Sequence, residues 1–168
     1  MKATSFSLVL LTAAATVALL VQPTAAQQGK GKAKAKGGDL TEVEFATAQS
    51  IADALAKGGP ATRPRAFMVS RDSHQLVAGG RRDVGGDAER HENAYDVVYI
   101  VDGSATYVTG GKMVGAKETG PGEMLGGTLE GGEVHELKKG DVIVVPPGIP
   151  HWWKDTDGVT YMIIKVNK

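Results

Sequence analysis

The 168-residue chain contains no cysteine, which excludes both disulfide bonds and thiolate metal ligands. It has only four histidines, and aromatic residues make up 5% of the sequence. A metal ion would therefore be held by imidazole nitrogens and by carboxylate or amide oxygens. No acidic residue precedes Asp39, whereas five of the 19 basic residues do, so the rest of the chain carries 14 basic and 19 acidic residues, a net charge of −5. A mildly acidic domain argues against nucleic acid as a partner, because binding to phosphates requires a basic surface.

The first 26 residues have the pattern of a secretory signal peptide. Lys2 supplies the positive end, Phe6 to Val21 is apolar, and Thr24-Ala25-Ala26 offers a cleavage site with small residues. We expect cleavage near Ala26, a secreted or periplasmic protein, and no stable membrane insertion afterwards; an uncleaved N-terminal anchor is the alternative. Residues 27–38 (QQGKGKAKAKGG) have nothing to bury and predict a disordered linker before one domain at 39–168.

A short helix is expected at the start of this domain. Thr47 is a suitable N-cap, and an apolar face with helical spacing follows it, made by Ala48, Ile51, Ala52 and Leu55. Gly58-Gly59-Pro60 would end the helix. For Val43 to Phe45, an extended segment that pairs with a sheet edge is the alternative.

From Arg65 onward the chain is typical of an all-β protein. Short segments rich in β-branched and aromatic residues alternate with turn signals such as Asp102-Gly103 and Gly110-Gly111. The expected strands are Ala66 to Ser70, Gln75 to Gly79, Val97 to Val101, Ala105 to Thr109, Met113 to Ala116, Val134 to Leu137, Val142 to Val145 and Tyr161 to Val166. About eight strands at this spacing predict a sandwich or a small barrel, and the Gly-rich stretch from Gly110 to Gly132 predicts an arm beside it.

The segment Gly140 to Asp155 (GDVIVVPPGIPHWWKD) places one histidine behind a stiff corner. The apolar strand Val142 to Val145 is broken by Pro146-Pro147-Gly148, because the prolines cannot donate hydrogen bonds and the glycine can adopt positive φ. His151 then opens the next strand. Such a corner would fix the imidazole relative to the barrel wall, as a metal ligand requires.

A second segment, Glu89 to Gly103 (ERHENAYDVVYIVDG), supplies partners for this histidine. Residues two apart on an extended chain point to the same side, so Glu89 and His91 would face one way. Asp96 follows a short turn and could be directed at the same point. Together with His151 these residues would form a ligand shell of nitrogen and oxygen atoms.

These two segments resemble the motifs of the cupin superfamily, G-x5-H-x-H-x3–4-E-x6-G and G-x5-P-x-G-x2-H-x3-N. In the second, only Asp155 departs from the pattern, standing in place of Asn. In the first, Gly85 or Gly86 lies near the opening glycine, and Glu89 stands where the first histidine is usual. His91 takes the second histidine position, Asp96 replaces the glutamate, and Gly103 closes the motif. A register with His91 and Asn93 as the histidine pair is the weaker alternative.

The resemblance covers about residues 65–168 and implies a cupin-type jelly-roll β-barrel. Carried over by position, it implies Glu89, His91, Asp96 and His151 as ligands of one divalent transition metal (Cu, Fe or Mn), with Glu89 and Asp96 also taking catalytic roles. Many cupins have lost their metal, so a sugar-binding or small-molecule-binding cupin without metal is the alternative. The family also implies a homodimer.

Other side chains could extend the site. His135 lies two residues before Leu137, so it would face inward if Leu137 packs in the core. As a ligand it would complete a set of three imidazoles that suits Cu(II) or Fe better than Mg or Ca; a core histidine bonded to a carbonyl is the alternative. Aromatic residues could contact a substrate or pack in the core or at a subunit interface, namely Trp152, Trp153, Tyr95, Tyr99 and Tyr107.

The sequence thus predicts a secreted, metal-dependent cupin oxidoreductase. Secretion and the aromatic residues favour a carbohydrate or plant-derived substrate, for example in copper-dependent oxidation of a polysaccharide. A non-catalytic binding protein, and an isomerase or lyase acting on a small acid or sugar, are the alternatives.

Overall fold

The computed structural model describes residues 39–57 and 64–168. The predicted signal peptide, the linker and the Gly58-Gly59-Pro60 stop lie outside these residues. The expected helix is confirmed as α1 (Ala48–Ala56), and the Thr47 hydroxyl accepts a hydrogen bond of 3.0 Å from the Ser50 N–H. Val43 to Phe45 forms no strand. Within the described ranges, no helix has the length and apolar character needed to cross a membrane.

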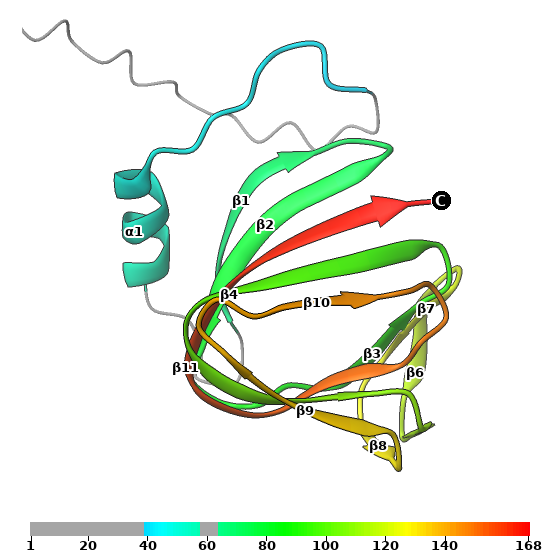
Figure 1. Cartoon of the computed structure of the whole chain (residues 1–168). Helices are drawn as coiled ribbons and strands as arrows, with labels where there is room; N and C mark the ends of the chain where they lie inside the picture. The colour runs from blue at the N-terminus through cyan, green and yellow to red at the C-terminus, as the bar shows by residue number, and fades with distance from the viewer. Residues whose placement is uncertain (1–38, 58–63) are drawn as a thin grey trace, which may run out of the picture. The chain divides into compact units, whose positions relative to one another are not determined.

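Eleven strands follow the helix in the described part of the chain (Figure 1). They are β1 (Arg65–Arg71), β2 (Gln75–Arg82), β3 (Ala88–His91), β4 (Ala94–Thr109), β5 (Lys112–Val114), β6 (Lys117–Gly120), β7 (Glu123–Leu125), β8 (Thr128–Glu130), β9 (Glu133–Lys138), β10 (Val142–Val145) and β11 (His151–Asn167). All pairings between them are antiparallel. This is the all-β jelly-roll architecture that the sequence predicts.

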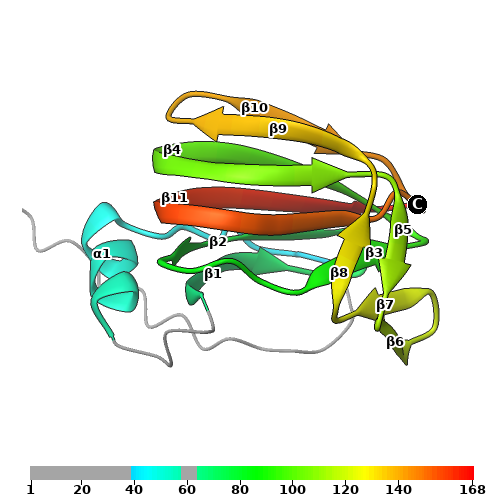
Figure 2. The same ribbon diagram turned by 90° about the horizontal axis from the view of Figure 1, so that it is seen from below.

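The two long strands β4 and β11 run through both layers of the roll. The second half of β11 pairs with β2 and with the first half of β4, which gives a layer in the order β1, β2, β11, β4, β10 (Figure 2). The first half of β11 pairs with β3 and with the second half of β4, and β7 and β9 extend this layer. Figure 1 shows both long strands curving from one layer into the other.

The predicted turn at Asp102-Gly103 is wrong, because β4 continues through it. The pairing between β4 and β11 is irregular there, and Gly103 has a φ of 76° while Gly158 opposite it has a φ of 57°. These glycines absorb a β-bulge, which bends a strand without ending it. The sequence also gives no strong signal for β6, β7 and β8, which are only three or four residues long.

The main core lies between the two layers. Strand β4 alternates in burial, so that Asp96, Val98 and Ile100 point inward and their neighbours point outward. Trp153 is buried, and its ring lies 4.8 Å from the rings of both Tyr107 and Tyr161, measured between centroids. A smaller cluster of Ala88, Val108 and Leu129 lies under the arm formed by β5 and β8. The core thereby fixes the strands that carry the histidines.

Candidate metal centre

The Pro146-Pro147-Gly148 corner places His151 as the sequence predicts. Gly148 has a φ of 82°, and its N–H donates a hydrogen bond of 2.8 Å to the carbonyl of His91. This bond joins the two sequence motifs directly. His151 is the first residue of β11 and pairs in register with Glu89 of β3. Two histidines that are 60 positions apart in the numbering therefore lie with their ring centroids 5.3 Å apart.

The backbone decides which nitrogen of His151 is free. Nδ1 lies 3.1 Å from the carbonyl oxygen of Ile149, which can only accept a hydrogen bond, so the proton resides on Nδ1. Nε2 is then the nitrogen with the lone pair. It is buried and has no hydrogen-bond partner among the described residues. A buried nitrogen of this kind is costly unless something binds it.

Two carboxylates converge on this nitrogen and on His91. Glu89 and His91 point to the same side of β3, as expected, with the Glu89 carboxylate 3.5 Å from His91 Nε2 and 3.8 Å from His151 Nε2. The Asp96 carboxylate lies 3.6 Å and 3.4 Å from the same two nitrogens. Asp96 is buried, and its Oδ1 also has no hydrogen-bond partner in the described part of the chain.

Two further residues of the site lie in segments that the sequence predicts as an arm and as a strand but does not connect to the two motifs. Glu123 of β7 accepts a hydrogen bond of 2.5 Å from Nδ1 of His91, and this leaves His91 Nε2 directed at the carboxylates. Lys165 of β11 places its Nζ 2.5 Å from His91 Nε2 and 3.0 Å from Asp96 Oδ2. The only sequence signal for Lys165 is a charged residue within an otherwise apolar strand.

The charges of the site shift its pKa values in consistent directions. Burial raises the pKa of Glu89, but the hydrogen bond with His91 and the neighbouring His151 and Lys165 outweigh burial and lower the pKa to about 2. Burial also raises the pKa of Asp96, but His151 and Lys165 lower it overall. For His91, burial lowers the pKa, and its pairing with Glu89 and Glu123 raises it overall. Both central carboxylates are therefore ionised at neutral pH.

These residues fit a divalent metal ion. Donor atoms of Glu89, His91 and His151 all lie within 4.8 Å of one another, and Asp96 contacts both imidazoles. The orphaned Nε2 of His151 and Oδ1 of Asp96 are lone-pair atoms without partners in the described residues. Two imidazoles and two carboxylates would hold the ion, while Glu123 would orient His91 from behind.

His135 lies apart from this group. Its Nε2 forms a hydrogen bond of 2.8 Å with the hydroxyl of Thr109, and it does not share the cluster of donor atoms. The structure therefore brings together four of the five predicted ligands. The set is two imidazoles with two carboxylates rather than three imidazoles.

Of the five candidate aromatic residues, only Tyr107 lies beside the site: it is buried, and its ring stacks on that of His151 with the centroids 6.1 Å apart. Because Asp96 points inward, Tyr95 and Tyr99 point outward and are 41% and 45% exposed, respectively. Trp153 fills the core. Trp152 packs against the smaller cluster, and its indole N–H donates a hydrogen bond of 2.6 Å to the carbonyl of Gly86.

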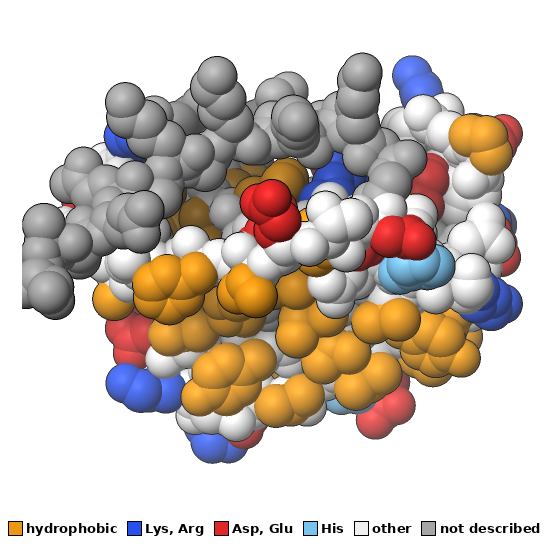
Figure 3. Space-filling model, turned by 90° about the horizontal axis from the view of Figure 1, so that it is seen from above, with side chains coloured by type: hydrophobic (Ala, Val, Ile, Leu, Met, Phe, Trp, Pro, Cys, Tyr) orange, Lys and Arg blue, Asp and Glu red, His pale blue; other side chains and the backbone are white. Residues whose placement is uncertain are grey.

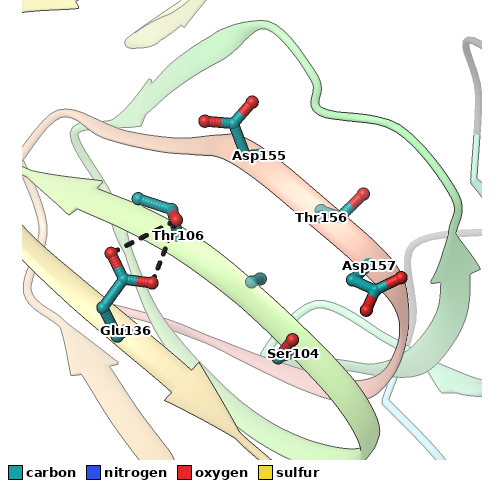
Figure 4. Close-up of a pocket in the computed structure, with 7 residues that line it drawn as sticks. Ser104, Thr106, Glu136, Asp155, Thr156 and Asp157 are labelled. Carbon is teal, nitrogen blue, oxygen red and sulfur yellow. Dashed lines mark hydrogen bonds between the residues drawn. The ribbon is translucent and has the colours of Figure 1, made fainter.

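A hollow on the solvent side of β4 and β11 contains none of the predicted site residues (Figure 4). The Thr106 hydroxyl donates to the carboxylate of Glu136 at its edge. The hollow is lined by Ser104, Ala105, Thr106, Glu136, Asp155, Thr156 and Asp157. It is separate from the candidate metal centre.

Residues 88–168 match the sequence model of the cupin family. The chain belongs to the cupin superfamily. The match begins at Ala88, so it includes every residue of the candidate metal centre and leaves out β1 and β2. No curated protein matches the chain.

Several solved structures resemble this cupin at low sequence identity. A Thermus thermophilus protein matches with a TM-score of 0.51 and 16% identity, covering 74% of this chain and 98% of its own. A Klebsiella pneumoniae protein with a double-stranded β-helix domain has a TM-score of 0.49 and 15% identity, covering 75% and 90%. The nucleoside dehydratase Pac13 has a TM-score of 0.44 and 12% identity, covering 61% and 68%. At 16% identity the likeness to the Thermus thermophilus protein shows the fold alone.

Proposed function

We propose that this cupin is an oxidoreductase with one transition-metal ion held by Glu89, His91, Asp96 and His151. The observation that carries the proposal is the Nε2 atom of His151. It is buried and lacks a hydrogen-bond partner among the described residues, and the bond from Nδ1 to the Ile149 carbonyl directs its lone pair at the two carboxylates. A hydrogen-bonding role would have provided a partner for this atom.

The donor set favours iron or manganese. Both accept mixed imidazole and carboxylate ligands, and cysteine is absent from the chain. Copper-dependent oxidation of a polysaccharide is the version of the proposal that depends most on His135, and the Thr109 hydroxyl already bonds to its Nε2. When bound, such a metal would supply Lewis acidity and one-electron chemistry.

The side chains around the metal would have different roles, depending on how far each is exposed. The Asp96 side chain is 1% exposed and that of His151 is 2% exposed, so these two would anchor the ion from the inside. The side chain of Glu89 is 23% exposed, and a substrate would approach from its side. As an ionised carboxylate at that opening, Glu89 would accept a hydrogen bond from a substrate hydroxyl and orient it.

The substrate class and the location of the protein stay proposals. We propose export through the predicted N-terminal signal and, on that ground, a carbohydrate or plant-derived substrate. The five aromatic residues considered as substrate contacts give it little support. Tyr95 and Tyr99 face outward, Trp152 and Trp153 are packed away from the metal centre, and Tyr107, which stacks on His151, is buried.

The second candidate function is metal-free binding or acid–base chemistry in the same place. It is favoured by one observation, the contact of the Lys165 amine with His91 and Asp96, which fills the centre without an ion. An isomerase or lyase built on this arrangement would turn over its substrate without an oxidant.

Metal analysis of the purified protein separates these functions. We expect about one Fe or Mn per chain after reconstitution, and loss of that metal in His91→Ala and His151→Ala. His135→Ala is the matched control and should keep its metal. If the wild-type protein retains no stoichiometric Fe, Mn or Cu after reconstitution, the metal-dependent function is wrong and the metal-free candidate replaces it.

A further inference from the structure

Lys165 reaches the point on which the metal ligands converge. It lies in β11 and pairs in register with Asp96 of β4, and its side chain is 22% exposed. Its Nζ is 2.5 Å from His91 Nε2 and 3.0 Å from Asp96 Oδ2. Both atoms belong to proposed metal ligands, so the lysine amine binds the same side chains that the metal ion would bind.

His91 Nε2 can bind either the Lys165 amine or a metal ion, but not both at once. The bond to Glu123 uses the proton on Nδ1, so Nε2 offers one lone pair, which accepts a hydrogen bond from the Lys165 amine. A metal ion would bind that same lone pair at about 2.0–2.2 Å. The amine and the metal therefore cannot occupy His91 together.

In the metal-free protein, the positive charge of Lys165 offsets the negative charges of the site. Glu89 and Asp96 contact the same two imidazole nitrogens. Two negative charges this close together, one of them fully buried, are costly without a positive partner. Among the described lysines and arginines, Lys165 is the one that forms an ion pair with Asp96. It thus supplies the charge that a metal would otherwise bring.

We infer that Lys165 is a tethered cation that stabilises the metal-free centre and competes with the metal for His91 and Asp96. This inference rests on the proposed metal site. Metal binding then requires the lysine side chain to swing toward solvent, which its partial exposure permits. The apparent metal affinity is lowered by the strength of the lysine contacts.

The test is Mn²⁺ titration by calorimetry into the full-length protein after removal of metal with chelator. Lys165→Met should bind Mn²⁺ about tenfold or more tightly than the wild type, because a like charge close to the ion is removed. Without metal, the same variant should melt at a lower temperature than the wild type. Lys165→Gln keeps a long side chain with a hydrogen-bond donor but removes the charge. It replaces Lys165→Met in the titration if the methionine variant does not fold.

Lys154→Met is the matched control, because it removes an exposed lysine of the same strand. It should bind Mn²⁺ as the wild type does. Equal affinity in the wild type and in the Lys165 variants overturns the competition but leaves the metal site standing. No Mn²⁺ binding in either overturns both, since removal of the competitor should have revealed the site.

Discussion

Both imidazoles of the centre are fixed through Nδ1, but by different kinds of partner. The Ile149 carbonyl holds His151, and the Glu123 carboxylate holds His91. A carboxylate makes the imidazole that it contacts a more basic ligand, whereas a carbonyl mainly sets the direction of the ring. His91 is therefore the ligand whose strength depends on a residue from outside the two motifs.

The low pKa of Glu89 predicts that acid destabilises the metal-free protein. The pKa of Glu89 is about 2 in the folded protein, against an ordinary value of 4.5, so its contribution is present above pH 4.5 and is lost as the pH falls toward 2. The full shift corresponds to about 3 kcal/mol of stability, of which about 2 kcal/mol is lost between pH 7 and pH 3. Urea denaturation at pH 7 and pH 3 measures this loss.

Glu89→Gln is the control for that experiment. The variant lacks the titrating group and should lose less stability than the wild type between the two pH values. The lowered pKa of Asp96 acts with the same sign and leaves a residual pH dependence in the variant. An identical loss in the variant and the wild type would show that Glu89 does not titrate in this way.

At the level of strands, the bend of β4 and β11 depends on two glycines. A Cβ on Gly103 would come within 2.7 Å of the Gly158 carbonyl oxygen, and Gly103 also has positive φ. We expect Gly103→Ala to combine strain with a clash and to cost more than about 2 kcal/mol. Gly140→Ala is the matched control, since Gly140 has a φ of 92° but nothing within 4 Å of its added Cβ.

For that control, strain alone should cost about 1–2 kcal/mol. Chemical denaturation of both variants measures the difference. Equal losses would mean that the close approach of β4 and β11 at this bend does not matter for stability.

The sequence predicts the site residues that lie in the two motifs, but not those that other strands contribute. Proline, glycine and the period of two are local signals, and they located the corner before His151 and the shared side of Glu89 and His91. Glu123 and Lys165 contact His91 from 32 and 74 residues away, through strand pairings that no local pattern specifies. The outward direction of Tyr99 followed from the inward direction of Asp96, which the sequence alone left open.

On the scale of the whole molecule, the layer that contains β10 exposes an apolar outer face (Figure 3). The strand register places the apolar side chains of this layer on the same side of the sheet. Val142 pairs with Tyr99, and both Val144 and Ile164 pair with Val97. The members that are more than a third exposed are Tyr95, Tyr99, Val142, Val144, Ile164 and Val166. Contiguous apolar surface of this kind is typical of an interface.

We propose that a second copy of the chain covers this face, in agreement with the homodimer that the sequence predicts. Val142→Lys would place a charge in the interface and should convert a dimer to a monomer in sedimentation or light scattering. Val134→Lys is the matched control, since Val134 and Val142 are 56% and 59% exposed, respectively, and Val134 lies in β9 of the other layer. A wild-type protein that is monomeric at high concentration would contradict the proposal.

The central claim is that four residues of two sequence motifs hold one metal ion, and a crystal of the protein soaked with Mn²⁺ or Fe²⁺ tests it most directly. Anomalous scattering should show one peak per chain at about 2.0–2.2 Å from donor atoms of Glu89, His91, Asp96 and His151, with Lys165 displaced from His91. A peak elsewhere, or an intact contact between Lys165 and His91 at saturating metal, would contradict the account.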